Sequence, residues 1–304
     1  MSERRLLVVI NPNSTKAHRV QSEVINPLHE NGDVFTTVQT LTPDTEENIA
    51  HLSALIRDGD RVISAAGDGT AMQVVNAVLR EGIDAEVGFL PYGNFNDIAK
   101  THGLTSPLQA YGDVGTTELH PLAVGVNEQF LRYAPAYVSL GWSAVAASHF
   151  GQSGSREKLR KQKRLASIIP SMGQLARDYF ALRGEKLPPF HASHARNVRD
   201  TVTDVLAVNS PRVGAVVRSK LDYYDGNNFG YNEVDVSRFF PNFLFGMQAL
   251  LGTLPASLRT STNVAFEAPA VVPFQSEGEF LRLEDVSTID IYKDPSKTIS
   301  VIHR

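Results

Sequence analysis

The sequence predicts an α/β N-terminal domain with a parallel sheet, followed by a mainly β, sandwich-like C-terminal domain with a helical insert. Up to about Leu104, apolar runs of strand length alternate with helical patterns, as they do in parallel α/β sheets. Closely spaced strand patterns with intervening turns follow, which is typical of a sandwich or barrel. The length of 304 residues favours two domains. We therefore expect domains at 1–115 and 116–304, with the last residues, about 290–304, free to return to the first.

The composition excludes several classes of protein. The chain has no cysteine, so it has neither a disulfide framework nor thiolate chemistry, which fits a reducing compartment. Its net charge of -4 gives no overall basic footprint for nucleic acid. The N-terminus carries no signal-peptide pattern, and the most apolar stretch, 243–251, is far too short to span a bilayer. We expect a cytoplasmic protein without a transmembrane segment or a nucleic-acid partner.

The first expected strand leads into a polar turn. Residues 5–10 form a continuous apolar run, which indicates a strand buried on both faces. Pro and Asn in 11–16 then mark a turn. Ser14, Thr15 and the Lys16 ammonium are groups that bind phosphate oxygens, although a plain loop with a solvated lysine is the simpler interpretation of this segment alone.

The next elements are a helix, a strand and a second helix. The patterns predict a helix over 20–29 and a strand over 34–40. Asp44 or Thr45 is expected to cap the second helix, and Gly59 to end it.

The rest of the chain is organised around the run Ala-Ala-Gly-Asp-Gly-Thr at 65–70. An apolar strand pattern over 61–65 precedes this run, and a helical pattern over 71–80 follows it. Strand, glycine turn and helix together place backbone N–H groups beside a phosphate.

Each residue of this turn has an expected role. Gly67 and Gly69 remove Cβ atoms that would keep a ligand from the backbone, and Thr70 is expected to cap the helix. A carboxylate repels phosphate, so Asp68 is expected to bind a divalent metal, orient a hydroxyl or accept a proton. A tight turn without a ligand explains the hexapeptide about as well.

A second polar turn follows the next strand. A strand over 87–90 opens on the glycine turn 91–97, which runs into a short helix ending at Gly103. Ligands of parallel sheets lie outside the carboxyl ends of the strands. The loops 11–16, 66–70 and 91–97 should therefore converge, which chance turns explain less easily than any single loop.

The second half reads as strands with one helical insert. The insert spans 155–183, and Pro170 is expected to split it. Its start, Arg156–Arg164, has six basic residues out of nine. A solvated helix face is the favoured interpretation of this run, and contact with anionic lipid headgroups is the functional one. A second helical segment, 239–251, reads as core. The strands are expected over 117–126, 130–140, 201–208, 213–217, 231–236, 262–268, 271–275, 280–283 and 287–292.

Two further polar turns carry carboxylates. Asp222 and Asp225 offer ligands suited to Mg²⁺ or Ca²⁺, although such Asp-Gly turns are usually only hairpins. Glu277 and Glu279 flank a glycine between two strands, where a surface hairpin tip is the plainer interpretation.

Taken together, these motifs resemble the diacylglycerol kinase catalytic-domain family, the bacterial lipid kinases related to sphingosine and ceramide kinases. The family opens with Asn-Pro-x-Ser-Gly-Lys, which is matched by 11–16, and continues with Gly-Gly-Asp-Gly-Thr, which is matched by 66–70. Its Leu-Pro-x-Gly-Thr-x-Asn-Asp-Phe-Ala is matched by 90–99. The segment 138–144 looks like its entry into the second domain, and Glu277-Gly278-Glu279 resembles its late Asp-Gly-Glu.

The resemblance implies an ATP-dependent lipid kinase whose N-terminal domain binds the nucleotide, with ATP and Mg²⁺ as cofactors and a lipid substrate at a membrane surface. Glu279 is the favoured proton acceptor, with Glu277 and Asp68 as the other catalytic candidates, and Asp225 with Asp222 would hold a structural metal ion. A peripheral position at the inner membrane face and a homodimer are compatible with it. The implied nucleotide-binding residues are Asn11, Ser14, Lys16, Thr40, Gly67, Asp68, Gly69, Thr70, Gly93, Asn94, Asn96 and Asp97.

The chain departs from the family pattern at several positions, and two alternatives follow. Thr15 and Ala66 replace glycines, Asn94 replaces a nucleotide-contacting threonine, and Met72-Gln73 replaces Asn-Glu. Glu277 stands for the late Asp. One alternative is a lipid-binding homologue that has lost catalysis. The other is a NAD kinase, which is disfavoured because no Thr-Pro-Thr-Gly-Ser-Thr segment is present.

Overall fold

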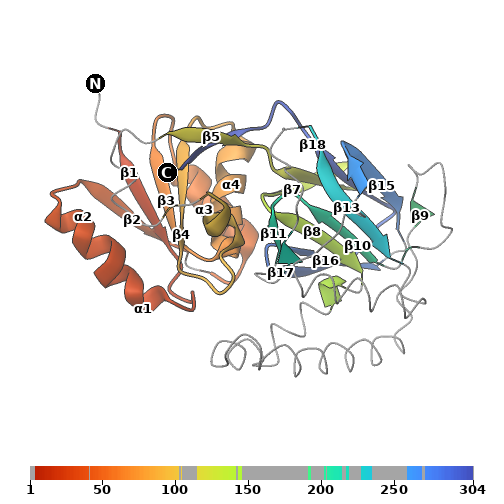
Figure 1. Ribbon diagram of the computed structural model, residues 1–304, viewed down its shortest axis with the longest axis horizontal. Helices are drawn as coiled ribbons and strands as arrows, with labels where there is room; N and C mark the ends of the chain where they lie inside the picture. The colour runs from red at the N-terminus through yellow and green to blue at the C-terminus, as the bar shows by residue number, and fades with distance from the viewer. Residues whose placement is uncertain are drawn as a thin grey trace.

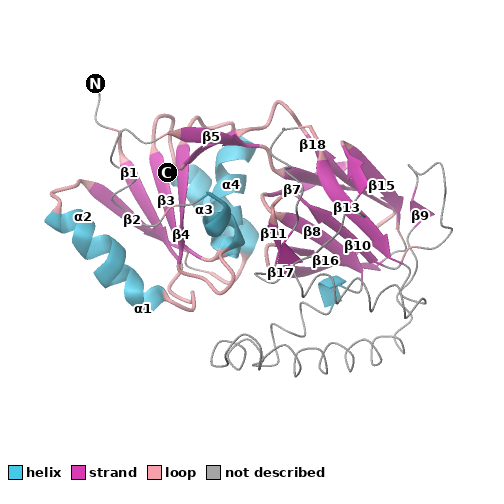
Figure 2. Ribbon diagram, in the orientation of Figure 1, coloured by secondary structure: helices cyan, strands magenta, loops and turns pink. Residues whose placement is uncertain are grey.

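The computed structural model has two lobes that lie side by side (Figure 1). The first lobe contains the α/β sheet and the second a set of antiparallel strands (Figure 2). The two parts of the predicted fold class, a parallel α/β part and a mainly β part, are therefore confirmed. The structure describes residues 4–40, 42–102, 104, 115–141, 143–145, 191–192, 202, 204–213, 217–218, 227–234, 259–268 and 271–303.

The sheet of the first lobe has the strand order β2-β1-β3-β4-β19-β5. β1 to β4 are parallel, β19 joins parallel to β4, and β5 pairs antiparallel with β19. The C-terminal strand therefore completes the sheet that the N-terminus begins. The strands are β1 (Leu6–Ile10), β2 (Phe35–Gln39), β3 (Arg61–Ala66), β4 (Glu86–Pro91), β5 (Thr116–Leu119) and β19 (Ile299–Ile302).

Helices cover both faces of this sheet (Figure 1). Alternate residues of a strand point to opposite faces. Leu6 and Val8 accordingly belong to one apolar cluster, with α1, η1 and α2, while Leu7 and Val9 belong to the other, with α3 and α4. The helices are α1 (Ala17–Val20), the π-helical η1 (Gln21–Ile25), α2 (Asn26–Glu30), α3 (Thr45–Leu55), α4 (Asp68–Glu81) and α5 (Asp97–His102).

The helix ends differ from prediction in three places. The first helical stretch begins at Ala17 rather than residue 20, and α3 ends at Leu55, before Gly59. α3 is capped by Asp44, whose carboxylate accepts from the N–H groups of Glu46 and Glu47. The prediction that Thr70 caps α4 is wrong. Gly67 is the N-cap, and its carbonyl accepts from Ala71 N, so the glycine turn is itself the first turn of α4.

The second lobe packs two larger sheets around one apolar cluster, with the orders β14-β13-β10-β8-β16-β17 and β7-β6-β18-β15-β9. β11 and β12 form a separate pair. The strands are β6 (Leu122–Val126), β7 (Gln129–Ala134), β8 (Tyr137–Gly141), β9 (His191–Ala192), β10 (Asp204–Val208), β11 (Arg212–Val213), β12 (Val217–Arg218), β13 (Phe229–Val234), β14 (Arg259–Ser261), β15 (Asn263–Glu267), β16 (Val271–Ser276), β17 (Glu279–Glu284) and β18 (Thr288–Lys293).

Three predicted strands are each divided in the structure. The ends of the expected strand 213–217 belong to β11 and β12, because Val213 pairs antiparallel with Val217. The expected strand 117–126 becomes β5 and β6, which lie in different sheets because the chain crosses between the lobes at 120–121. The expected strand 130–140 becomes β7 and β8, which are separated at Pro135. A proline cannot donate to a strand ladder, so a break is favoured at each of these points, Pro121 and Pro135.

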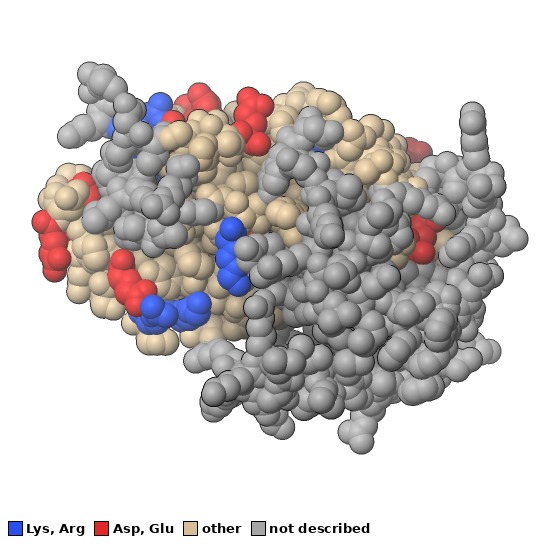
Figure 3. All heavy atoms as spheres, viewed as in Figure 1, with Lys and Arg blue, Asp and Glu red and all other residues tan. Residues whose placement is uncertain are grey.

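Several expectations fall outside the described residues: the helical insert, the segment 239–251, the basic run Arg156–Arg164, and both Asp222 and Asp225. Within the described part of the chain, every helix is too short or too polar to cross a lipid bilayer. On the face shown in Figure 3, acidic and basic side chains of the first lobe are interspersed, in keeping with the small net charge of -4.

Candidate active site

The loops after β1, β3 and β4 meet at the carboxyl edge of the first sheet. Hydrogen bonds join them in pairs. Asn11 Nδ2 donates to Thr70 Oγ1 at 3.2 Å, and Thr15 Oγ1 donates to Asn94 Oδ1 at 2.7 Å. Lys16 Nζ donates to the carbonyl of Pro91 at 3.3 Å. The convergence expected from the sequence is therefore present.

The glycines allow two of these loops to touch. A Cβ atom on Gly93 would lie 2.3 Å from Gly67 Cα, and one on Gly67 would lie 3.1 Å from Gly93 Cα. The contact between the loops therefore favours glycine at both positions, and the ligand role expected for Gly67 stays a prediction. Gly69 differs, because the nearest atom to a Cβ there is the carbonyl oxygen of Glu277, at 4.0 Å.

Asp68 joins the second loop to the third. Its Oδ1 accepts a hydrogen bond from Ile98 N at 3.0 Å, at the start of α5. A carboxylate is favourable at a helix N-terminus. Burial raises the pKa of Asp68, and the N–H groups of Ile98, Asp97 and Asn96 oppose that rise. The carboxylate therefore holds loop 91–97 against the glycine turn.

The third loop is a rigid turn built by Asn96. Its side chain accepts from Gly93 N at 2.6 Å and donates to Gly93 O at 2.9 Å. Its backbone is in the left-handed region, with φ 53°, a conformation that asparagine tolerates better than most residues. Asn96 and Asp97 are both buried, whereas the adjacent Asn94 is exposed.

Ser14 and Thr40 lie at the ends of neighbouring strands. Ser14 is half-buried, and its backbone N–H donates to Asn11 O. Thr40 follows β2, is buried, and donates its N–H to Ile10 O, while its hydroxyl has no hydrogen-bond partner. A buried hydroxyl without a partner costs free energy, so this atom is suited to receive a ligand group.

The turn between β16 and β17 brings two carboxylates from the second lobe, and the structure separates them. Glu277 is buried, with φ 50°, and its Oε1 accepts from Ala136 N and Tyr137 N at 2.6 and 3.0 Å. Its Oε2 has no hydrogen-bond partner. Burial raises the pKa of Glu277 well above the usual value, and the nearby Asp68 raises it further. Burial and the nearby Asp68 therefore both favour the neutral form of Glu277.

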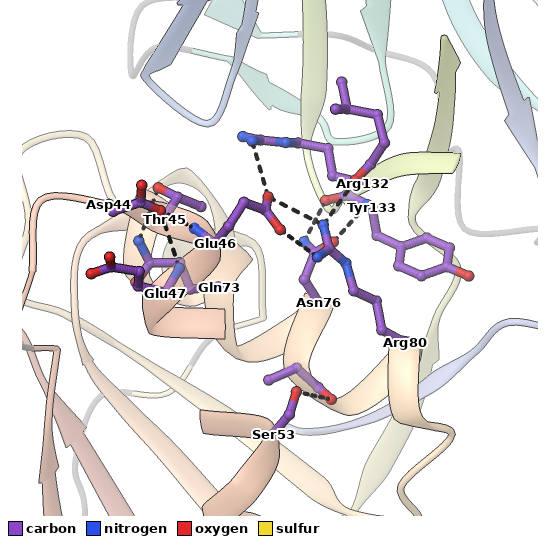
Figure 4. Close-up of polar contacts among 12 residues, drawn as sticks. Asp44, Thr45, Glu46, Glu47, Ser53, Gln73, Asn76, Arg80, Arg132 and Tyr133 are labelled. Atoms are coloured by element: carbon purple, nitrogen blue, oxygen red, sulfur yellow. Dashed lines mark hydrogen bonds and ion pairs between the residues drawn. The ribbon is translucent and has the colours of Figure 1, made fainter. Parts of the chain in front are cut away.

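Glu279 instead lines an open pocket of about 710 Å³ between the lobes. Its Oε2 accepts from Arg132 Nη1 at 2.8 Å, and Arg132 is buried while Glu279 stays 21% exposed. The Arg132 guanidinium also contacts Glu46 of α3 at 3.4 Å. In Figure 4, the Glu46 carboxylate lies between the guanidinium groups of Arg80 and Arg132.

Comparison with known proteins identifies the first part of the chain. Residues 5–126 match the model of the diacylglycerol kinase catalytic domain. This region belongs to the diacylglycerol kinase catalytic-domain family. The resemblance drawn from the motifs is therefore confirmed, and the matched kinase-family region contains all three converging loops.

Two relatives and two solved structures extend the match beyond the kinase-family region. Proteins with lipid kinase names from Staphylococcus aureus, strains MRSA252 and JH9, are each 26% identical over 196 residues, 60% of this chain and 57% of theirs. The match thus spans little more than half the length of these curated relatives. A diacylglycerol kinase structure from Bacillus anthracis str. Sterne covers 99% of this chain, and 97% of its own, at a TM-score of 0.63 and 13% identity. A second structure from that organism matches this chain with a TM-score of 0.66 and 16% sequence identity. These likenesses show the fold.

Sequence reasoning missed three polar residues that support the site: Arg132, Tyr137 and Asn76. Arg132 carried a usable signal, because a single charge inside an apolar strand pattern indicates a buried, paired charge. Asn76 and Tyr137 sit within apolar patterns and carried none. Tyr137 is buried, and its hydroxyl accepts from Gln275 Nε2 at 3.1 Å. Burial raises the pKa of Tyr137 well above the usual value, with Glu277 adding to the rise.

Proposed function

We propose that the protein is an ATP-dependent lipid kinase that transfers the γ-phosphate of ATP to a lipid hydroxyl. The observation that carries the proposal is the juxtaposition at Gly69. The first turn of α4 belongs to three converging polar loops of the kinase-family region, and the backbone carbonyl oxygen of Glu277 in the second lobe lies 4.0 Å from the Cβ position of Gly69. The proposed donor-binding turn of one lobe thus lies against the turn of the other lobe that carries Glu277 and Glu279.

The residues at this site fit a nucleoside triphosphate. The first N–H groups of a helix have no intrahelical acceptor, so those of Asp68, Gly69 and Thr70 are suited to phosphate oxygens. Gly69 has no side chain, and the nearest atom to its Cβ position is 4.0 Å away, so a phosphate oxygen can approach the backbone there. The Thr40 hydroxyl supplies a further polar atom, and Lys16 supplies a positive charge at the same edge. We assign nucleotide binding to these residues and to Asn11, Ser14, Gly67, Gly93, Asn94, Asn96 and Asp97, which build the loops.

Magnesium fits the site only together with phosphate. Among the described residues, no group of three or more histidine, aspartate or glutamate side chains is arranged to bind a metal. Mg²⁺ in kinases is bound by one or two carboxylates plus the substrate phosphates, and Asp68, in the first turn of α4, is the carboxylate that we assign to that purpose. When bound, the ion neutralises phosphate charge. A second, structural ion at Asp225 and Asp222 stays a prediction, which melting with EDTA of the parent and Asp225→Ala would test.

We assign the proton acceptor to Glu279. A general base must be ionised and within hydrogen-bond reach of the hydroxyl. Glu279 is partly exposed in the pocket, where an acceptor hydroxyl can reach it, and its carboxylate pairs with Arg132. Glu277 is buried with its Oε1 bound to backbone N–H groups, and burial raises its pKa, so its part is to hold the turn that presents Glu279.

The acceptor is proposed to be a diacylglycerol-like or sphingoid-like lipid at a membrane surface. The names of the relatives support the lipid class. The basic run Arg156–Arg164 is the proposed contact with anionic headgroups, which implies a peripheral protein at the inner membrane face. Binding to anionic vesicles should then weaken as salt is raised, because salt shortens the range of electrostatic attraction. Binding that is insensitive to salt would remove this contact.

A catalytically weakened homologue is the second candidate. Thr15 and Asn94 are two departures from the family pattern. Thr15 Oγ1 donates a hydrogen bond to Asn94 Oδ1 at 2.7 Å, so this oxygen of Asn94 is engaged within the protein. Thermal shift with ATP and Mg²⁺, combined with a kinase assay over diacylglycerol, a sphingoid base, phosphatidylglycerol and a non-lipid alcohol, separates the cases. A ligand at 100 times its Kd adds about 2.7 kcal/mol of stability. Stabilisation by ATP together with lipid phosphorylation supports the kinase. Stabilisation without phosphorylation supports the weakened homologue. The absence of both effects would contradict both candidates.

A further inference from the structure

Helix α4 is hydrogen-bonded along the outer edge of strand β7 in the other lobe. The Asn76 side chain donates from Nδ2 to Tyr133 O at 2.8 Å, and its Oδ1 accepts from Tyr133 N at 2.8 Å (Figure 4). Nδ2 also donates to Met72 O at 2.9 Å, so the donors and the acceptor of this fully buried amide are all engaged. β7 is the end strand of its sheet, and Asn76 takes the place of a neighbouring strand at Tyr133.

A second contact repeats this pattern one helical turn later. Arg80 Nη2 donates to Leu131 O at 2.8 Å. Four residues of a helix advance about 6 Å, and two residues of a strand advance about 6.6 Å, so the two spacings match. Since Asn76 meets Tyr133 and Arg80 meets Leu131, the helix and strand run in opposite directions.

The strand is shaped for this contact. Val124 pairs with Arg132 and Gly125 with Phe130, so Leu131 is an extra residue, a β-bulge, in β7. Bulges disrupt the ladder locally and re-aim groups. The carbonyl that accepts the hydrogen bond from Arg80 belongs to this bulged residue. We call the contacts of Asn76 and Arg80 with β7 the α4–β7 seam.

An ion pair from α3 reinforces the seam. Glu46 pairs with Arg80 at 2.5 Å and with Arg132 at 3.4 Å, so one carboxylate of the first lobe holds guanidinium groups of both lobes. Arg132 in turn holds Glu279 at 2.8 Å. The seam therefore connects directly to the residue proposed as the base.

The seam also connects to both sides of the site. The N-terminus of α4 is the glycine turn, and the chain beyond β7 supplies Ala136 N and Tyr137 N, which hold Glu277. A helix is stiff over these few turns. The contacts at Asn76 and Arg80 therefore govern how far the Gly69 turn stands from the Glu277–Glu279 turn.

We propose that Asn76 and Arg80 are positioning residues, which set the separation of the donor-binding turn and the acceptor-side carboxylates. This inference rests on the proposed kinase function. Asn76 is fully buried, whereas Arg80 lies in the wall of the pocket that Glu279 lines, so a label–label distance is needed beside kcat to separate positioning from contact with the acceptor. Misplacement of about 1 Å in an active site costs about 100-fold in rate, so loss of the seam should lower kcat with little effect on the Kd of ATP, whose ligands are in the first lobe.

The test compares Asn76→Ala and Arg80→Met with the matched control Ser53→Ala. Ser53 Oγ donates to Ala77 O at 3.2 Å, a polar contact to the same helix that stays within the first lobe (Figure 4). Arg80→Lys is the conservative rescue, because a lysine can still reach one of the two acceptors. For each protein, kcat, the Kd of ATP and the melting temperature are measured.

A distance measurement completes the test. The chain has no cysteine, so spin labels can be attached to cysteines introduced by Glu30→Cys at the end of α2 and Glu284→Cys at the end of β17, both exposed positions. The label–label distance distribution should broaden or shift in Asn76→Ala and Arg80→Met and stay unchanged in Ser53→Ala.

The expected result is a kcat lowered about 100-fold in Asn76→Ala and Arg80→Met, with ATP affinity retained, partial recovery in Arg80→Lys, and a normal Ser53→Ala. Unchanged kcat in both seam variants of an active parent overturns the inference, as does an unchanged distance distribution. If the parent neither binds ATP nor phosphorylates a lipid, the proposed function fails, and the distances alone then decide whether the seam sets the lobe separation. Should Asn76→Ala fail to fold, Arg80→Met, at a partly exposed position, carries the test.

Discussion

The carboxylate of Asp68 in α4 accepts a hydrogen bond from the backbone N–H of Ile98 in α5 at 3.0 Å. One glycine turn of the site is thereby tied to the helix that follows the other. Asp68, the aspartate of the Gly-Asp-Gly turn, therefore has a structural role whatever its part in phosphoryl transfer. Its two tasks can be separated by substitution.

Asp68→Ala should lower the free energy of unfolding by about 1–2 kcal/mol, the usual cost of losing a helix-capping side chain. Asp68→Asn retains an oxygen acceptor for Ile98 N and should keep most of that stability, while losing turnover if the charge is needed. Urea denaturation of both variants and the parent measures the first effect. An alanine variant as stable as the parent would show that the contact with Ile98 contributes nothing.

Gly93→Ala should destabilise the protein by about 1–3 kcal/mol, the typical cost of inserting a methyl group into a packed contact. The added Cβ would lie 2.3 Å from Gly67 Cα, and this backbone neighbour can yield only by moving a loop. Gly69→Ala is the matched control, because its nearest atom is 4.0 Å away. Equal denaturation midpoints for the two variants would contradict the close approach of the loops.

Gly69→Val should weaken ATP binding at least about tenfold, which is about 1.4 kcal/mol. The branched side chain would project from the first turn of α4 toward the carbonyl oxygen of Glu277, into the place where phosphate is proposed to bind. Calorimetric titration with ATP and Mg²⁺ measures the Kd, and the melting temperature checks the fold. Unaltered affinity in a folded variant would move the nucleotide elsewhere.

Glu279→Gln should keep the fold and ATP binding while lowering turnover at least about 100-fold, the low end for loss of a general base. Glu277→Gln should be mild, because burial favours the neutral form of Glu277, its Oε1 already accepts from two backbone N–H groups, and an amide has nearly the same shape. Steady-state kinetics on the best lipid acceptor distinguishes them. An inactive Glu277→Gln beside a normal Glu279→Gln would transfer the role, and two normal variants would remove the turn from the mechanism.

Asp204→Asn should change how stability depends on pH. Asp204 is buried and accepts from Ser143 N at 2.7 Å, and burial raises its pKa to about 7. As pH rises from about 4, the Asp204 carboxyl ionises in the unfolded chain before it ionises in the native protein. The native protein therefore loses up to roughly 4 kcal/mol of stability by about pH 7. The asparagine cannot ionise and should escape this loss. Denaturation at about pH 5 and about pH 8 checks it, and parallel changes in parent and variant would contradict it.

The strands and the loops of the site were predictable because their signals are local. Continuous apolar runs identify β1, β3 and β4, and a polar turn follows each of them, with glycines in the turns after β3 and β4. Parallel strands end at one edge, so the meeting of Asn11 with Thr70 and of Thr15 with Asn94 follows from the strand pattern. The start of α4 was missed, because a Gly-Asp-Gly run reads equally as a turn and as a first helical turn.

What the sequence by itself determined is therefore the fold class, the family and the chemistry of the three loops, all of which depend on near neighbours in the chain. Only the tertiary structure decided how the lobes join and which residues face one another across the boundary. Glu277 and Glu279 are two residues apart, yet the fold buries one against Ala136 and pairs the other with Arg132. Asn76 looks like any polar residue in a helix until Tyr133, 57 positions away, is brought against it. Such partners are set by the packing of whole elements, which no local pattern encodes.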